Sequence, residues 1–480
     1  MIDDLNVIAD TLIILIAAQA VWWLSWSRGW SLKSCLLWGV IIQFVVPYFA
    51  VAAIARRWEL PIIQRTNLEF ALDEGDWQWC LFAANIVLAA IGLGYLSVKR
   101  VVLSNSPAIQ SSPLVRIDGT KVLGVFAVIV VSYLVWAVGI SLTHGLREHF
   151  ANPLARRGGA DAGEAAGFLI ILGGLATTSA CLCVAGIGAM AWGESGRVRA
   201  ALLVASGLVM AGPVLFSFGG RGAVIGFFGV GLVSMYAARG RRVPLAIWSM
   251  LGSFAVLFAV FGHTVFTYDA WSSGIVSSLT EALEHYMAQV EVPLQKLVTF
   301  GQSVIHPILI RDAMESGLPP HWFRDVPELP LYFLPKLVHG VQYYPLQVEM
   351  MDLFPDPGAN NNIKIVAYLW WGGGWSGLIG GGLVCGGFLA VVDQWIARAS
   401  VHPALTGPSI VLALELGVGL FNGGPAAMRA SLPALLVLLM LKLILADQVR
   451  PSVGLSGTRV ASDATPSRGL GPSESTSVTR

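Results

Sequence analysis

Long runs of apolar residues, separated by short polar connections, dominate the pattern along this chain. Crossing the hydrocarbon core of a bilayer takes about 20 apolar residues in a helix. Runs of this kind occupy residues 7–26, 35–54, 77–97, 121–141, 167–192, 199–218, 222–238, 244–266, 364–392, 406–425 and 431–449. The pattern therefore predicts an all-α polytopic integral membrane protein with about eleven transmembrane helices.

The spacing of the runs predicts four regions. Residues 1–266 hold transmembrane helices 1–8, residues 267–363 form one long polar connection, and residues 364–449 hold helices 9–11. The tail 450–480 is rich in Ser, Thr and Gly and has few large apolar residues, which is typical of a disordered segment. The first run follows an acidic start without a basic flank, so we expect a retained helix and not a cleaved signal peptide.

The connections between the runs differ in positive charge, which predicts their orientation. Short cytoplasmic connections carry an excess of Lys and Arg. The richer set of alternate connections contains Arg28, Lys33, Lys99, Arg100, Arg116, Lys121, Arg197, Arg199, Arg239, Arg241, Arg242 and Arg398. This bias predicts an N-terminus outside and a C-terminus in the cytoplasm. By helix parity it also makes 267–363 an extracytoplasmic loop between helices 8 and 9.

Composition narrows the class of protein further. Charged residues make up only 12% of the 480 residues, about half the share of a soluble protein, and 30 Lys+Arg nearly balance 29 Asp+Glu. These values exclude a soluble enzyme and a basic nucleic-acid binder. The five cysteines lie in apolar stretches without a ligand set around them, so we expect no structural metal and no disulfide framework.

The long loop begins with a predicted amphipathic helix over 277–304, kinked at Pro293. Its polar side carries Glu281, Glu284 and His285, and the i,i+4 spacing puts Glu281 and His285 on one face. Such a pair suits a general base with an orienting partner, or a clamp for sugar hydroxyls. The alternative, which the pattern favours slightly, is a solvated face on a helix that lies at the membrane surface.

Aromatic residues and prolines punctuate the rest of this loop, over 319–324, 329–336 and 341–345. A ring face can stack on the C–H surface of a sugar, and it can also rest at a membrane interface. The loop then runs into a glycine-rich helix in which Gly373, Gly377 and Gly381 share one stripe. The stripe favours close helix packing, with a broken helix that opens into a cavity as the alternative.

Two ionisable residues near the membrane are candidates for function. Arg221 lies in a tight glycine turn, where its guanidinium and the backbone N–H groups could bind phosphate, or where it could snorkel at a helix end. Glu415 lies inside the run 406–425, where an acid is costly and is by default a functional-site hypothesis. It suits a proton-coupled transporter, or a pair with a buried polar residue.

This layout resembles the bacterial O-antigen and oligosaccharide repeat-unit polymerases. The resemblance lies in about eleven helices, the arginine turn at 217–222, one large late outward loop, and a Pro/Asn-containing turn before a glycine-rich helix. The segments 284–296 and 334–336 are also similar to these proteins, and the similar region covers roughly 200–395.

The resemblance implies a C-type glycosyltransferase-like fold in the bacterial inner membrane that needs no metal or other cofactor. The substrate would be a polyprenyl-pyrophosphate-linked oligosaccharide, polymerised into the O-antigen of lipopolysaccharide or into an exopolysaccharide. The partners it implies are membrane lipid and a chain-length regulator protein, with no nucleic acid. An O-antigen ligase and a polysaccharide or lipid-linked sugar transporter are the alternatives.

The resemblance also implies roles for particular residues. The arginines that bind pyrophosphate at the outward face correspond to Arg221, with Arg311 and Arg324 as candidates in the loop. A loop acid or histidine would accept the proton of the acceptor hydroxyl, and the candidates are Glu281, Glu284 and His285.

Overall fold

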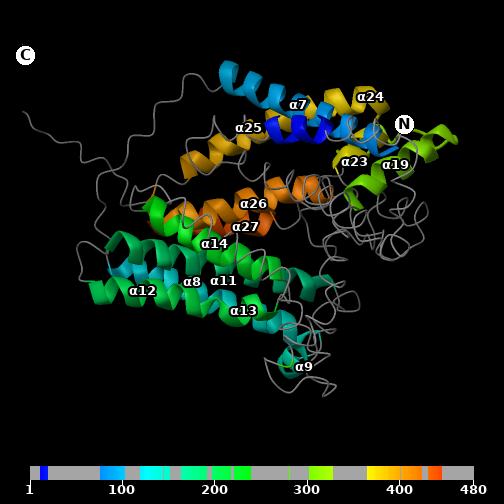
Figure 1. The fold of residues 1–480 in the computed structure, drawn as a ribbon. Coiled ribbons are helices and arrows are strands. Elements are labelled where there is room, and N and C mark those ends of the chain that lie inside the picture. The colour runs from blue at the N-terminus through cyan, green and yellow to red at the C-terminus, as the bar shows by residue number, and fades with distance from the viewer. Residues whose placement is uncertain are drawn as a thin grey trace, which may run out of the picture.

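A computed structural model of the chain describes residues 11–19, 76–102, 119–143, 145–151, 164–191, 197–217, 221–238, 281, 302–327, 365–399, 402–423 and 431–445. These ranges are almost entirely helical and contain no strand. The first range, 11–19, is one helical stretch near the N-terminus (Figure 1).

The remaining described elements follow in chain order. They are α7 (Asp76–Val102), α8 (Gly119–Ser141), α9 (Leu146–Ala151), α11 (Glu164–Ala191), α12 (Arg197–Met210), α13 (Gly212–Ser217), α14 (Arg221–Ala238), α19 (Gln302–Glu315), α23 (Ile365–Trp371), α24 (Gly374–Ser376), the π-helical turn η3 (Gly377–Gly381), α25 (Gly382–Ala399), the 3-10 turn η4 (Pro403–Leu405), α26 (Thr406–Gly423) and α27 (Ser431–Leu445).

Five helical segments are long and apolar enough to cross a membrane, which confirms an all-α protein of the membrane class. They are Gln78–Arg100, Gly119–Ser141, Ala166–Ala191, Arg197–Leu215 and Gly374–Ile396. Three shorter apolar helices accompany them, Gly226–Tyr236, Pro403–Gly417 and Ser431–Leu445. The predicted runs 35–54 and 244–266 lie outside the described residues, so the total of about eleven stays a prediction.

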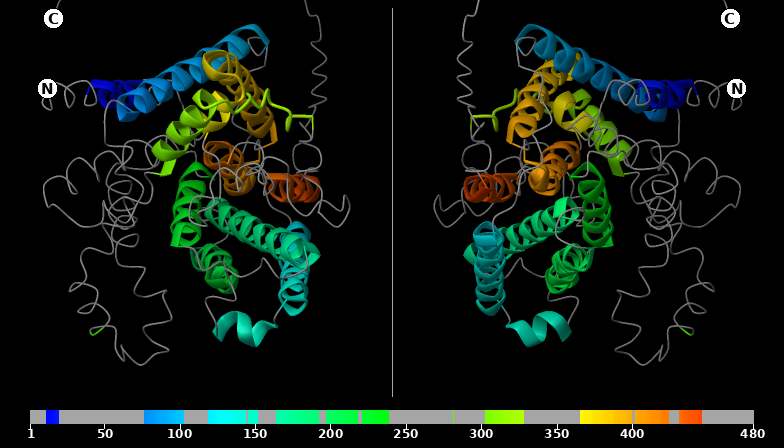
Figure 2. Two further views of the ribbon diagram at one scale, coloured as in Figure 1. Left: turned by 90° about the vertical axis from the view of Figure 1, so that its right-hand side faces the viewer. Right: turned by 90° about the vertical axis from the view of Figure 1, so that its left-hand side faces the viewer.

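The helices form two groups that α26 and α27 join. In the first group α11 lies at the centre and packs against α8, α12 and α14. In the second group α7 packs along α25, and α19 packs against α23. The long helices lie roughly side by side in Figure 1, and in the turned views of Figure 2 several of them, α7 among them, cross obliquely. The short elements α9, α19, α23 and α24 all lie at one end, on the right of Figure 1.

Glycines permit the closest helix contacts in both groups. A Cβ atom at Gly386 of α25 would lie 2.0 Å from the Ile91 carbonyl oxygen of α7, and one at Gly94 would lie 2.1 Å from the Leu383 carbonyl oxygen. Likewise, a Cβ atom at Gly173 of α11 would lie 2.5 Å from the Trp136 nitrogen of α8. The helix backbones therefore touch at positions that no larger residue can occupy.

The predicted single run 364–392 is wrong, because the helix breaks near its start. α23 ends at Trp371, and the chain then turns through Gly373 and Gly374, whose φ angles are 156° and 61°. Glycine adopts such positive φ angles without steric cost, and a hydropathy pattern does not show them. The spanning segment therefore begins only at Gly374.

The predicted glycine stripe packs against the short helix before this break. Cβ atoms at Gly377 and Gly381 would lie 2.1 Å from the carbonyl oxygen and 2.6 Å from the Cδ2 atom of Leu369 in α23. Close packing and a break in the helix therefore occur together here, and an opening of this break into a cavity stays a prediction.

Candidate functional site

The loop after α19 is fixed to the C-terminal end of α23 by two hydrogen bonds. The Trp371 indole Nε1 donates to the Pro319 carbonyl oxygen at 3.2 Å, and the His321 backbone N–H donates to the Trp371 carbonyl oxygen at 2.7 Å. The His321 and Trp371 rings also pack together, with centroids 5.1 Å apart. These contacts give the loop one defined position at the end of the helix bundle.

Three buried polar side chains reinforce this attachment. The Tyr368 hydroxyl donates to both carboxylate oxygens of Asp325, at 2.8 and 3.0 Å. His321 Nδ1 lies 3.5 Å from Asp325 Oδ1, which is beyond an ordinary hydrogen bond, and it has no other partner among the described residues. Only 3% of His321, 2% of Asp325 and 5% of Tyr368 is exposed.

The environment of His321 keeps its imidazole neutral. Burial, with a smaller contribution from the positive charge of Arg324, lowers the pKa of His321 from 6.5 to about 4. The Arg324 Nε atom also donates to the His321 carbonyl oxygen at 3.2 Å. At pH 7 the loop therefore carries the Arg324 cation next to a neutral His321.

The backbone of this loop is strained at two consecutive residues. Trp322 and Phe323 both have a φ angle of 53°, which costs about 1–3 kcal/mol for a residue other than glycine. The Phe323 ring occupies the space that a side chain at Gly372 would need, since a Cβ atom there would lie 2.3 Å from the ring. The Phe323 and Tyr368 ring centroids are 5.7 Å apart. Packing of Phe323 into this glycine-lined space offsets the strain.

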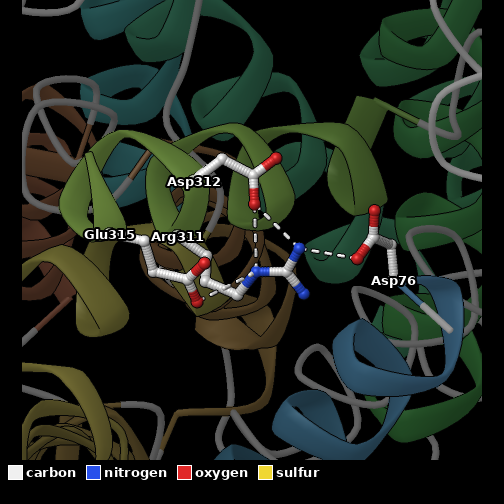
Figure 3. A network of polar contacts seen from close by, with 4 residues as sticks. All are labelled: Asp76, Arg311, Asp312 and Glu315. Carbon is white, nitrogen blue, oxygen red and sulfur yellow. Dashed lines mark hydrogen bonds and ion pairs between the residues drawn. The ribbon is translucent and has the colours of Figure 1, made fainter. Parts of the chain in front are cut away.

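A second polar cluster links α19 to α7 (Figure 3). Arg311 Nη2 lies 2.6 Å from Asp76 Oδ1 and 2.7 Å from Asp312 Oδ1, and Arg311 Nε lies 3.7 Å from Glu315 Oε1. Burial acts to lower the pKa of Arg311, but the hydrogen bonds with Asp76 and Asp312 outweigh it and raise that pKa. Three carboxylates thus surround a permanently charged guanidinium.

Aromatic rings lie directly beneath this cluster. The Arg311 guanidinium lies 4.9 Å from the centroid of the Trp79 ring, a cation–π contact. Trp79 packs edge-on against Trp370 with centroids 4.9 Å apart, and Trp370 packs against Trp375 at 5.1 Å. Tryptophans gathered at one end of membrane helices are typical of the bilayer interface.

The structure places the predicted site residues in different surroundings. Arg221 is the first residue of α14, and Glu281 is helical and exposed. Arg311 lies among acids, whereas Arg324 is exposed on the loop next to His321. Glu284 and His285 lie outside the described residues, so a Glu281–His285 pair stays a prediction. In the described ranges no three His, Cys, Asp or Glu residues are grouped to hold a metal ion.

His321, Asp325 and Tyr368 were not predicted from the sequence as one cluster. The i,i+4 spacing of His321 and Asp325 was the available local signal, but Tyr368 is 43 residues beyond Asp325. No local pattern connects residues at that separation.

The fold and this site define an integral membrane protein of helices, with a polar and aromatic site at one end of the bundle. A search against models of protein families gave no match. Searches of curated proteins and of solved structures gave no significant match either. The chemistry of the site is therefore the basis for a function.

Proposed function

We propose that the protein polymerises lipid-linked oligosaccharide repeat units into an O-antigen or exopolysaccharide, at the outer face of the bacterial cytoplasmic membrane. The observation that carries this proposal is the anchored loop 319–327, which presents the exposed Arg324 at the end of a membrane helix bundle. An arginine in that position suits the pyrophosphate of a polyprenyl-linked donor, whose phosphates lie at the depth of the lipid headgroups.

The distribution of charge supports an outward position for this loop. Basic residues gather at the opposite end of the described helices, where they are Lys99, Arg100, Lys121, Arg197, Arg199 and Arg398. The end with the loop carries the acids Asp76, Asp312, Glu315 and Asp325, and also the basic residues Arg147, Arg311 and Arg324. A cytoplasmic excess of Lys and Arg is the usual pattern in membrane proteins, and this distribution supports an outward position for the loop.

In the proposed reaction the acceptor sugar hydroxyl attacks the anomeric carbon of the donor. The bond from that carbon to the pyrophosphate oxygen breaks, and the lipid pyrophosphate leaves. We assign the pyrophosphate to Arg324 and Arg221, because at Arg311 it would meet three carboxylates and be repelled. Glu281, which is exposed, accepts the hydroxyl proton, with Glu284 and His285 as its predicted neighbours.

Substitution of the two arginines tests this proposal. Truncation of a charged transition-state contact costs about 2–4 kcal/mol, on the order of a hundredfold in rate. In Arg221→Ala and Arg324→Ala strains, surface polymer should shorten to single repeats while lipid-linked units accumulate. The lysine variants should retain part of the activity, because they keep the charge but lose the bidentate fork.

Arg147→Ala is a matched control, because Arg147 is also exposed at this end of the bundle but is not assigned a role. Normal chain length in both alanine strains, at wild-type expression, would contradict the proposal. Polymer of normal length that stays inside the cell would favour the transporter alternative, which the half-buried Glu415 of α26 suits. Loss of glycan attachment to its final acceptor, with normal polymer, would favour a ligase.

A further inference from the structure

The residues of the loop alternate between inward and outward positions. His321 and Asp325 are buried, and Phe323 packs over Gly372. Between them Trp322 is 66% exposed and Arg324 is exposed. The inward residues make contacts with α23, and these contacts hold the outward residues in fixed positions.

Trp322 is unusual among the exposed tryptophans of this end because a strained backbone holds it outward. Its φ angle of 53° lies in the left-handed region, which a bulky side chain rarely adopts. Its ring edge lies over the helix break, since a Cβ atom at Gly373 would be 3.4 Å from Trp322 Cζ3. Strain of this kind persists where the surrounding contacts over-determine it, and it gathers at ligand-binding positions.

Membrane anchoring alone does not require this arrangement. An interfacial tryptophan needs only the right depth, because the headgroup region accepts many orientations of the ring. Trp375, which is 44% exposed, reaches the same end of the bundle from the three-residue helix α24 and, unlike Trp322, does not have a positive φ angle. The strained Trp322 has a defined orientation, two residues before the exposed Arg324.

We propose that Trp322 is a sugar-binding platform on which a pyranose ring of the lipid-linked substrate stacks, next to the phosphate at Arg324. Tryptophan offers a broad apolar face to the C–H surface of a sugar, and its fixed orientation lowers the ordering cost of binding. This inference rests on the proposed function, which places a sugar next to a phosphate at this loop.

The test measures binding to the full chain in lipid nanodiscs with two probes. One probe is a polyprenyl pyrophosphate that carries a single N-acetylhexosamine, and the other is the same lipid without the sugar. Trp322→Ala should weaken binding of the sugar-bearing lipid by about three- to tenfold and leave binding of the bare lipid unchanged. Trp322→Tyr should retain most of the affinity, because it keeps a ring face.

Val326→Ala is the matched control, because Val326 is 43% exposed on the same loop and has no ring. An equal loss for both probes in Trp322→Ala would make the residue a lipid contact and overturn the inference. Equal binding of both probes by the wild-type protein would also overturn the inference, but it would still agree with a pyrophosphate site. A wild-type protein that binds neither probe would overturn the proposed function itself.

Discussion

The Tyr368 hydroxyl donates to both carboxylate oxygens of Asp325, and this pair connects the loop after α19 to a helix 43 residues further along the chain. Both residues are almost fully buried. A buried carboxylate depends on its hydrogen-bond donors, because it has lost its water. The pair therefore fixes the loop that presents Trp322 and Arg324.

Removal of the donor should weaken this attachment. Tyr368→Phe keeps the ring but leaves Asp325 without the hydroxyl, which should destabilise the folded protein by about 1.5–3 kcal/mol. Thermal unfolding in detergent measures the change. The double variant Tyr368→Phe/Asp325→Asn should lose less stability than the two single variants together. Fully additive losses of stability would contradict a direct contribution of the pair.

Protonation of His321 should make stability depend on pH in the acid range. Burial and Arg324 lower the pKa of His321 to about 4, so between pH 6.5 and 4 the unfolded chain binds this proton and the folded chain does not. The contribution of His321 to the free energy of unfolding is complete above pH 6.5. It falls as the pH decreases towards 4, and below pH 4 it changes no further. Unfolding midpoints of wild type and His321→Gln at pH 7, 5.5 and 4 measure it. The wild type should lose more stability than the variant, and identical profiles would refute the assignment.

A methyl group at the crossing of α7 and α25 should disrupt their contact. At Gly386 the added carbon would lie 2.0 Å from the Ile91 carbonyl oxygen, so Gly386→Ala forces the helices apart and should cost about 1–3 kcal/mol. Gly380→Ala is the matched control, because no atom lies within 4 Å of the added carbon there. Folded yield and thermal unfolding compare the two variants. Equal behaviour would show that the helices do not cross at Gly386.

The sidedness of the bundle is open to chemical labelling. In a background with the native cysteines replaced by alanine, Glu315→Cys should react with a membrane-impermeant thiol reagent in intact cells, once the outer membrane is permeabilised. The Glu315 side chain is 70% exposed at the end with the loop, whereas Arg199 is exposed at the opposite end. Arg199→Cys should therefore react only after lysis of the cytoplasmic membrane. The reverse pattern would put the loop in the cytoplasm and remove the basis of the polymerase proposal.

The length of the apolar runs was sufficient to predict most of the described long helices. Three helices match the predicted apolar runs closely. The runs 77–97 and 121–141 lie inside α7 and α8, and the run 167–192 extends one residue beyond α11. The match is close because membrane insertion requires a sufficient length of apolar residues. The run 364–392 failed because its break depends on the positive φ angles of Gly373 and Gly374. Such angles depend on the packing of Phe323 and Leu369 as well as on local sequence.

The candidate site was less predictable than the helices. Arg311 was a candidate because it is a cation in a predicted outward loop, but its partner Asp76 lies 235 residues earlier in the chain. Sequence spacing reveals i,i+4 pairs such as His321 and Asp325 and gives no sign of contacts across the fold. Trp322 appeared only as one of several aromatics, since backbone strain has no signature in composition.

The contact between Asp76 and Arg311 also constrains how the protein is made. Because 235 residues separate the two, α7 leaves the ribosome long before α19 exists. At about 5–20 residues per second, the interval is on the order of 10–50 seconds. Through that time Asp76 lacks Arg311, and the Gly94 surface lacks Leu383 of α25. We therefore expect nascent chains that stop before α19 to be targets for membrane quality control, even though α7 is apolar enough to insert on its own.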